Sequence, residues 1–383
     1  MRPPLSNFGA ASGKNILHLG VKEMWSLARD PIMILLIVYA FTLSIYSIST
    51  ALPDSLSQAP IGIVDEDQSA LSQRIVNAFQ PPWFKPPTMV SREGMDARMD
   101  AGKDTFALDI RPNFQEDVLA GRSPAIQLNT DATRISQAFS GSSYVQRIVL
   151  EEVQSWLQRY RSVFKPPVDI EERVRYNPNL SRRSFGAVVA LIDQITMLSV
   201  LLTGAALIRE RERGTVEHLL VMPVTPFQIM TSKIWSMGLV VLVASALCMI
   251  FIVEGVLQVP INGSRALFLC GTALHIIAAT SLGIFLATFA RTMPQFALLM
   301  IMVLLPLQML SGGVTPRESM PEFVQQIMVA APTTHFVKVA QKIIFRGGSL
   351  DVVWPQFLAL ALIGALLFSV ALIRFRKTIG SMA

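Results

Sequence analysis

The stretch SFGAVVALIDQITMLSVLLTGAALI, residues 184–208, holds a single ionisable side chain, Asp193, and the charged run RERER follows at 209–213. At about 1.5 Å per helical residue, the apolar run covers the roughly 30 Å hydrocarbon core of a bilayer. The alternating charges end the run at the membrane surface. The sequence therefore predicts a membrane-spanning helix followed by a polar loop.

Five further stretches are as long and nearly free of charge, so the chain is expected to be an α-helical polytopic membrane protein. The first begins with Asp30 as a helix N-cap and Pro31 at the first helical position. About 30 polar and amphipathic residues precede it, which fits poorly with a cleaved signal peptide. The six predicted spans are 31–53, 184–208, 234–257, 266–290, 292–315 and 352–373.

Residues 54–183 form a long polar insertion between the first two predicted spans. Short apolar strands alternate there with segments of helical periodicity, which predicts an inserted α/β domain outside the cytoplasm. A longer helix from about Arg134 to Phe164 is expected to pack the sheet or to present a docking surface to a periplasmic partner. The insertion contains no His or Cys, so it offers no Ser-His-Asp or Cys-His set.

The distribution of basic residues predicts the orientation. The insertion holds 16 of the 33 basic and 17 of the 27 acidic residues, so the net charge of +6 belongs to the membrane part and does not indicate nucleic-acid binding. With the N-terminus inside, the inside segments carry 12 basic residues and the short outside segments carry five, four of them in 317–351. The positive-inside rule therefore predicts both termini in the cytoplasm.

The N-terminal segment alternates apolar and basic side chains at near-helical spacing, which is typical of a helix lying in the membrane interface. A cytosolic helix that caps another subunit is the alternative. The remaining predicted segments, in chain order, are the cytoplasmic N-terminus with this helix at 1–30, a cytoplasmic loop at 209–233, an external re-entrant or amphipathic segment at 316–351 and a cytoplasmic tail at 374–383.

The loop at 209–233 is expected to be compact. Gly214 breaks the charged run, and Pro223 ends the short helix that follows. Thr225, Pro226 and Gln228 form a capping box with proline at the first position, so a new helix should begin there and continue into the third span. A charged loop flanking a membrane is the simpler interpretation, but the order of its residues argues otherwise.

That order, RERERGTVEHLLVMPVTPFQIM at 209–230, resembles the cytoplasmic turn after span two in the membrane subunits of ABC-2 type ABC exporters. Six spans and a large first external loop also fit that family. Further similar stretches are IGIVDEDQS at 61–69, LLPLQMLSGGVTPRESMP at 304–321 and RFRKTIG at 374–380. The resemblance runs from end to end and is strongest to the YhhJ-type inner-membrane transport permeases, which implies the bacterial inner membrane.

In this family the turn contacts a nucleotide-binding subunit, so the resemblance implies that it couples ATP hydrolysis to movement of the spans. His218 matches the YhhJ type and not the broader pattern. The residues implied for coupling are Arg211, Glu212, Arg213, Gly214, Thr215, Glu217, His218, Leu219, Leu220 and Pro223.

The chain has no G-x-x-x-x-G-K-[ST] motif, so it cannot cradle ATP phosphates with the usual loop, and it is expected to be no enzyme and to bind no cofactor or metal itself. ATP and Mg²⁺ would bind to a partner ABC ATPase. The resemblance also implies a second ABC-2 membrane subunit, which could be the same chain or a different one, perhaps fused to the ATPase. It further implies a HlyD-type periplasmic membrane fusion protein.

Polar side chains within the spans are candidates for the translocation path, because such residues are rare in a bilayer. Asp193, His275 and Gln308 are these candidates. A helix–helix hydrogen bond is the alternative for Asp193, and a neutral hydrogen-bonding role is the alternative for His275. Spacing does not make Asp193 and His275 partners, which argues against an intramembrane hydrolase.

Together these features predict a permease that moves drug-like or amphipathic compounds outward with ATP hydrolysed elsewhere. The alternative from another class is a membrane sensor or scaffold, whose external domain binds a ligand or partner without transport. Against that alternative, the C-terminal segment of about ten residues leaves no room for a cytosolic output domain.

Overall fold

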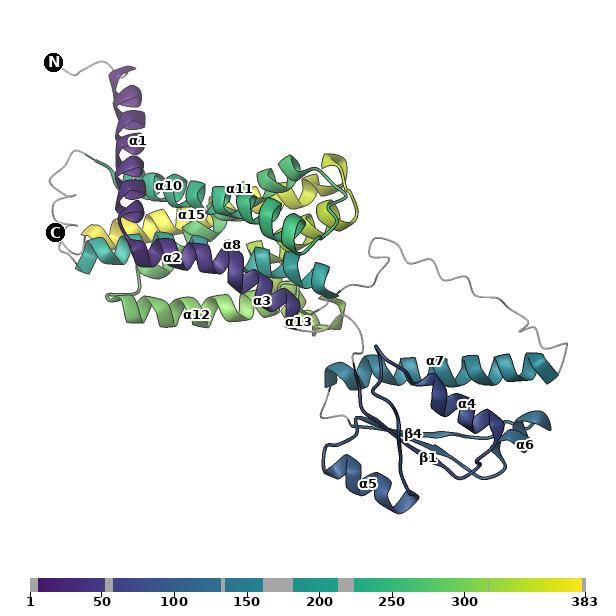
Figure 1. Cartoon of the computed structure of the whole chain (residues 1–383). Coiled ribbons are helices and arrows are strands. Elements are labelled where there is room, and N and C mark those ends of the chain that lie inside the picture. Colours follow the sequence, from purple (N-terminus) through teal and green to yellow (C-terminus); the bar gives the residue numbers. More distant parts are fainter. Residues whose placement is uncertain are drawn as a thin grey trace. The chain divides into compact units, whose positions relative to one another are not determined.

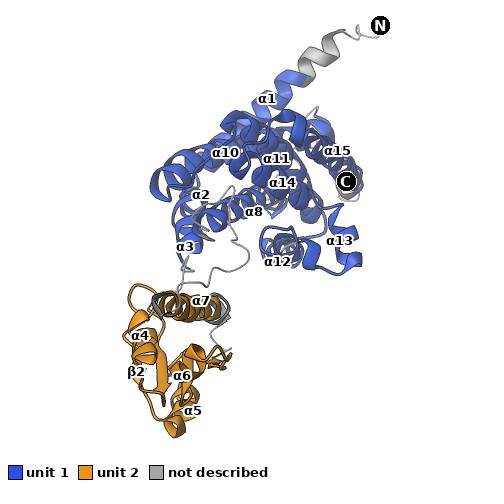
Figure 2. Ribbon diagram, turned by 90° about the vertical axis from the view of Figure 1, so that its right-hand side faces the viewer, with its two compact units in different colours: residues 1–51, 182–383 blue, residues 52–181 orange. Residues whose placement is uncertain are grey.

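The computed structural model describes residues 6–51, 58–131, 135–160, 182–212, 224–315 and 317–380. The chain divides into two compact units, residues 1–51 with 182–383 and residues 52–181 (Figure 2). The first unit is a bundle of helices, and the second is a sheet with helices on it (Figure 1).

The helices of the first unit are mostly long and apolar. Its main elements are α1 (Ser6–Ala28), α2 (Pro31–Tyr39), η1 (Ala40–Ser44), α3 (Ile45–Thr50), α8 (Arg182–Glu212), α10 (Pro226–Cys248), η2 (Met249–Val256), α11 (Arg265–Ala287), α12 (Met293–Met309) and α15 (Leu350–Gly380). Between α12 and α15 lie four short elements, η3 (Arg317–Ser319), α13 (Glu322–Met328), α14 (Pro332–Ala340) and η4 (Gln341–Phe345).

Five helices within the described residues are long and apolar enough to cross a membrane. They are Pro31–Thr50, Arg183–Glu212, Pro226–Val256, Arg265–Ala287 and Leu350–Lys377. The fifth predicted span, 292–315, corresponds to α12, which has 17 residues and is shorter than the others. Pro306 removes a backbone donor near its end, and Gly312 beyond it has a left-handed φ of +94°. The count of six spans stays a prediction.

Two helix starts confirm the predicted capping. The Asp30 side chain accepts a hydrogen bond from the backbone N–H of Met33 at 3.2 Å, with Pro31 at the first helical position. At the start of α10, Thr225 and Gln228 form the reciprocal capping box, with hydrogen bonds of 3.0 and 3.3 Å. These contacts satisfy amide groups that a helix start otherwise leaves without partners.

Helix α8 lies at the centre of the bundle. In the most apolar stretch of α8, 67 % of the residues are buried, whereas the figure is 17 % for the corresponding stretch of α15. A Cβ at Gly283 of α11 would lie 2.5 Å from the carbonyl oxygen of Val200, so the absence of a side chain lets α8 and α11 approach closely. Helices α2, α12 and α15 instead expose many large apolar side chains, as helices facing lipid do.

The second unit is a four-stranded sheet in the order β2-β1-β3-β4. The strand β1 pairs in parallel with β2 and β3, and β4 runs antiparallel to β3. Apolar side chains from β1, β3, α4, α6 and α7 contribute to its main core. The elements are β1 (Ile61–Asp65), α4 (Ala70–Ala78), β2 (Thr88–Met89), α5 (Arg92–Asp100), β3 (Phe106–Ile110), α6 (Phe114–Leu119), β4 (Gln127–Thr130) and α7 (Ile135–Tyr160).

The last helix extends beyond the sixth predicted span. The predicted tail begins at 374, and α15 continues without a break to Gly380. The Arg374 guanidinium lies 4.4 Å from the ring centroid of Phe289, at the turn after α11, and this cation–π contact favours continuation of the helix.

Candidate functional site

The charged run after the second predicted span ends α8, and the structure describes its first four residues, Arg209 to Glu212. Together these residues contact three different parts of the bundle. Arg213, Gly214, Thr215, Glu217, His218, Leu219, Leu220 and Pro223 lie outside the described residues. The described candidates for coupling are therefore Arg211 and Glu212.

Arg209 pairs with the residue that caps α2. Its Nη1 atom donates to Asp30 Oδ2 at 2.6 Å, and both side chains are about a quarter exposed. Asp30 therefore serves two contacts, because its other oxygen caps α2. Through this pair the end of α8 is joined to the turn between α1 and α2.

Glu210 belongs to a buried lysine cluster, which consists of Lys233, Glu23 and Glu210. Lys233 lies on α10 with only 2 % of its side chain exposed, and its Nζ atom is 2.9 Å from Glu23 Oε1 and 2.9 Å from Glu210 Oε2. A buried ammonium group needs such partners, because desolvation of an unpaired charge costs several kcal/mol. The cluster joins α1, α8 and α10.

The cluster also determines the ionisation of Glu23. Burial acts to raise the pKa of this carboxyl group, but the charge of Lys233 and its hydrogen bond outweigh burial, so the pKa lies below its usual value. Glu23 is therefore an anion at neutral pH, as the contact with Lys233 requires.

Arg211 and Glu212 contact the turn between α11 and α12. Arg211 Nη1 donates to the carbonyl oxygen of Ala290. Glu212 Oε1 accepts from the backbone N–H of Met293 at 2.9 Å. Met293 is the first residue of α12, whose N-cap Thr292 makes no capping hydrogen bond with its side chain. Glu212 thus places a negative group at the N-terminus of α12, where the helix dipole favours it.

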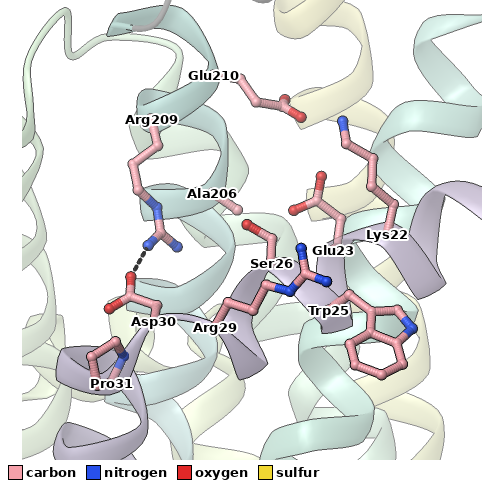
Figure 3. A pocket seen from close by; sticks show the side chains of 10 residues that line it. All are labelled: Lys22, Glu23, Trp25, Ser26, Arg29, Asp30, Pro31, Ala206, Arg209 and Glu210. Atoms are coloured by element: carbon pink, nitrogen blue, oxygen red, sulfur yellow. Dashed lines mark hydrogen bonds and ion pairs between the residues drawn. The ribbon is translucent and has the colours of Figure 1, made fainter.

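A cavity of about 710 Å³ lies beside the pair of Arg209 and Asp30 and beside Glu23 and Glu210 of the lysine cluster. Charged side chains of both signs line it, from α1 and from the end of α8 (Figure 3). The close-up shows Arg209 paired with Asp30 on one side of the cavity, and Glu23 and Lys22 on the other. Its lining residues are Lys22, Glu23, Trp25, Ser26, Arg29, Asp30, Pro31, Ala206, Arg209 and Glu210.

This arrangement suits the transfer of motion. The segment 213–223 is joined on one side to Glu212 and on the other, through Val224, to the capped start of α10. The hydrogen bonds and ion pairs of Arg209, Glu210 and Glu212 link the end of α8 to α1, α2, α10 and α12.

The structure brings two of the three candidates for the translocation path into contact, and the third packs against the same helix, α8. Gln308 Nε2 donates to the backbone carbonyl of Asp193 at 3.3 Å, which brings these two residues together. The Asp193 side chain itself is half-buried. His275 is fully buried, with its ring stacked on Phe336 at 4.4 Å between centroids. Its Nε2 atom lies 2.8 Å from Oγ1 of Thr196, which is about one turn of α8 from Asp193.

The sequence did not identify the ion pairs of the structure, and two groups of them involve residues of predicted spans or their ends. One is the lysine cluster. Lys233 near the start of an apolar helix could have indicated it, because a buried cation needs a carboxylate partner. The other is the pair of Glu254 and Arg265, whose side chains approach to 2.7 Å across the turn between η2 and α11. Among the side chains that the structure describes, no group of three His, Cys, Asp or Glu residues could hold a metal ion.

Comparisons with known proteins agree with this architecture. A family model described as "ABC-2 family transporter protein" matches residues 31–373. The chain is 60% identical over 370 residues to an inner membrane transport permease, YhhJ, of Escherichia coli K12, covering 97% of this chain and 99% of the relative. It is 28% identical over 364 residues to the probable multidrug ABC transporter permease YbhR of the same organism, covering 94% and 97%.

The fold and these matches define a membrane transport permease with several apolar helices. More specifically, the chain belongs to the ABC-2 family of transporter proteins. Membership of that family implies an ABC ATPase and another membrane subunit as partners.

Proposed function

We propose that the chain is the membrane-spanning subunit of an exporter that moves drug-like or amphipathic compounds outward. ATP would be hydrolysed on a nucleotide-binding subunit that holds the ATP and Mg²⁺. The observation that supports this most directly is the end of α8, where Arg209 to Glu212 contact three different parts of the bundle. Such contacts suit a loop that receives force from a partner.

The role of the loop 213–223 follows from its place between two held helix ends. In this proposal Arg211 and Glu212 keep the end of α8 aligned, and the residues from Arg213 to Pro223 contact the ATPase. The residues proposed for that contact are Arg213, Gly214, Thr215, Glu217, His218, Leu219, Leu220 and Pro223. ATP hydrolysis then shifts the bundle between inward-open and outward-open states.

Substrates would pass near Asp193, Gln308 and His275. Asp193 and Gln308 support this best, because they are neighbours and neither side chain is fully buried. His275 would act as a packing and hydrogen-bonding group in the present conformation, since its side chain has no exposed surface.

The proposed assembly lies in the bacterial inner membrane with both termini in the cytoplasm and residues 54–183 in the periplasm. The excess of basic residues in the proposed inside segments supports this orientation. A second ABC-2 subunit, identical or different, would complete the path. A HlyD-type membrane fusion protein would contact the periplasmic domain.

The decisive experiment uses inverted membrane vesicles that contain the chain together with its ATPase. An exporter should accumulate the amphipathic dye Hoechst 33342 inside such vesicles when ATP is added. Glu217→Gln and Gly214→Val should each reduce ATP-dependent uptake by about tenfold or more while ATP hydrolysis continues. Glu93→Gln, an exposed site in the second unit, is the matched control and should behave as wild type.

Wild-type uptake in both loop variants would remove the coupling role from this segment.

Extraction in mild detergent followed by mass spectrometry tests the partners. An ATPase and a fusion protein should co-purify with the tagged chain, and a stable complex without an ATPase would contradict export.

A sensor or scaffold is the second candidate, and one observation favours it. A cavity of about 690 Å³ lies in the second unit between α7 and the sheet, lined largely by apolar side chains such as Phe114, Val149 and Leu157. A cavity of this size suits a ligand or a peptide segment. Absence of ATP-dependent uptake, combined with ligand binding by the full-length chain, would support this candidate.

A further inference from the structure

Four basic residues lie in the segment 317–351, which the predicted orientation places outside, where the positive-inside rule gives no reason for them. All four line one cavity of about 740 Å³, the basic cavity. They are Arg317, Lys338, Lys342 and Arg346, and Glu318 is the single acidic residue in the lining.

The basic cavity belongs to the first unit and lies at the end of the bundle to which the insertion is attached. Phe185, in the first turn of α8 directly after the insertion, is part of its lining. The other lining residues come from the segments between the end of α12 and the first turns of α15. It is therefore distinct from the cavity in Figure 3, which lies at the opposite end of α8.

The charges in the basic cavity are poorly balanced. Among the described residues, Arg317, Lys338 and Lys342 make no ion pair with a carboxylate; Arg317 donates to the backbone oxygen of Gln325 at 3.1 Å, and Lys342 donates to that of Val352 at 3.2 Å. Neutral acceptors satisfy hydrogen bonds but do not cancel charge. An excess of positive charge thus converges on the cavity.

Lys338 shows the effect of this crowding. Burial lowers the pKa of its ammonium group, and the charges of Arg317 and Lys342 lower it further, whereas the charge of Glu318 acts to raise it. A bound anion would offset the repulsion from Arg317 and Lys342, because it adds negative charge within a partly enclosed space. The ammonium group of Lys338 is thus placed where it can attract an anionic ligand.

The rest of the lining indicates what kind of anion fits. Phe185, Val314 and Val337 provide an apolar side, and the Phe185 ring stacks on that of Phe345 at 5.9 Å between centroids. Gln325 and Gln356 add amide groups. A ligand with an anionic head and an apolar body matches this combination, whereas a free inorganic ion would use only the basic part.

We propose that the basic cavity binds the phosphate head of an anionic amphiphile, with Arg317, Lys338 and Lys342 as its direct partners. The ligand would be a phospholipid of the surrounding bilayer or a phosphate-bearing compound from solution. The site does not require the export function, because binding at this end of the bundle can occur without ATP.

The test is native mass spectrometry of the purified full-length chain, titrated in separate arms with phosphatidylglycerol, phosphatidylcholine and inorganic phosphate. Phosphatidylglycerol should bind more tightly than phosphatidylcholine, whose head carries no net charge. In K338Q/K342Q the affinity for phosphatidylglycerol should fall about tenfold or more, since two charge-assisted contacts are lost. R317Q, a second variant, guards against a folding defect in the double variant.

The matched control is K377Q, an exposed lysine at the other end of α15. It should bind phosphatidylglycerol as wild type does. A second outcome also supports the phosphate site: inorganic phosphate binds, the variants abolish this binding, and phosphatidylglycerol is not preferred over phosphatidylcholine. The ligand would then be a soluble compound. Equal affinity for the two lipids without phosphate binding, or an equal loss in K377Q, would overturn the proposal.

Discussion

The substitution Lys233→Met tests the lysine cluster most directly. Methionine preserves the length and apolar stem of the side chain but removes the ammonium group. Glu23 and Glu210 then remain as two buried carboxylates with 12 and 14 % of their side chains exposed. Each loses a cationic partner at 2.9 Å.

The size of the effect follows from these distances. At 2.9 Å and an effective dielectric constant of about 20, each pair contributes an attraction of about 6 kcal/mol. Desolvation of the three ions offsets much of that attraction. Removal of one member of a buried ion pair costs about 3 to 5 kcal/mol, because the charge left behind is uncompensated. We expect Lys233→Met to destabilise the first unit by that amount.

The order of the variants is more informative than any single value. Glu210→Gln leaves the pair of Lys233 and Glu23 intact, so it should cost only about 1 to 2 kcal/mol. The triple variant Glu23→Gln, Lys233→Met, Glu210→Gln removes all three charges and should recover part of the stability lost in Lys233→Met.

The assay is unfolding of the purified protein in mixed micelles, followed by intrinsic tryptophan fluorescence against denaturant. A double-mutant cycle between positions 210 and 233 then isolates their coupling. If Lys233→Met costs less than about 1 kcal/mol, as an exposed ion pair would, the cluster is solvated and the reasoning is wrong. A triple variant less stable than Lys233→Met would also refute it.

Three further predictions concern other parts of the bundle. Arg209→Gln should destabilise by only about 1 kcal/mol in the same unfolding assay, since its pair with Asp30 is partly exposed; a loss above about 3 kcal/mol would contradict this. Because the pKa of Glu23 in the folded protein lies below its usual value of 4.5, the stability it contributes is present above about pH 4.5 and is lost as pH falls through the folded pKa. The melting temperature of wild type should therefore exceed that of Glu23→Gln at neutral pH, and the difference should shrink on acidification. A difference that grows on acidification would be inconsistent with the ion pair. Gly283→Ala should cost roughly 1 to 3 kcal/mol because the added Cβ meets Val200, whereas Gly13→Ala, with open space around it, should be neutral or stabilising.

Local signals in the sequence were sufficient for much of the fold. Asp30 with Pro31 and Thr225 with Gln228 predicted two helix starts, because a cap depends on residues within four positions of each other. The apolar residues of β1 fit the short apolar strands expected in the insertion. The length of α12 could not be predicted from composition. The apolar run extends to 315, but the helix ends at Met309, because Pro306 and the turn beyond it interrupt the run.

The contacts of the candidate site could not be predicted in the same way. Lys233 is separated from Glu23 by 210 positions, and Glu212 from Met293 by 81. Helical periodicity gives the face of each residue but does not show which helices become neighbours. The alternating charges at 209–212 indicated the end of an apolar run, and only the packed bundle identifies their partners.

The separation of Glu23 and Lys233 also has a consequence for biogenesis. Glu23 leaves the ribosome 210 residues before its cationic partner, which corresponds to roughly 10 to 40 seconds at ordinary rates of bacterial synthesis. During that interval α1 has no buried counter-charge to receive its carboxylate, so it should stay undocked while the sheet unit is already complete. Docking of α1 onto α10 would then be a late event in assembly, and a chain truncated before residue 233 should leave α1 accessible to proteases.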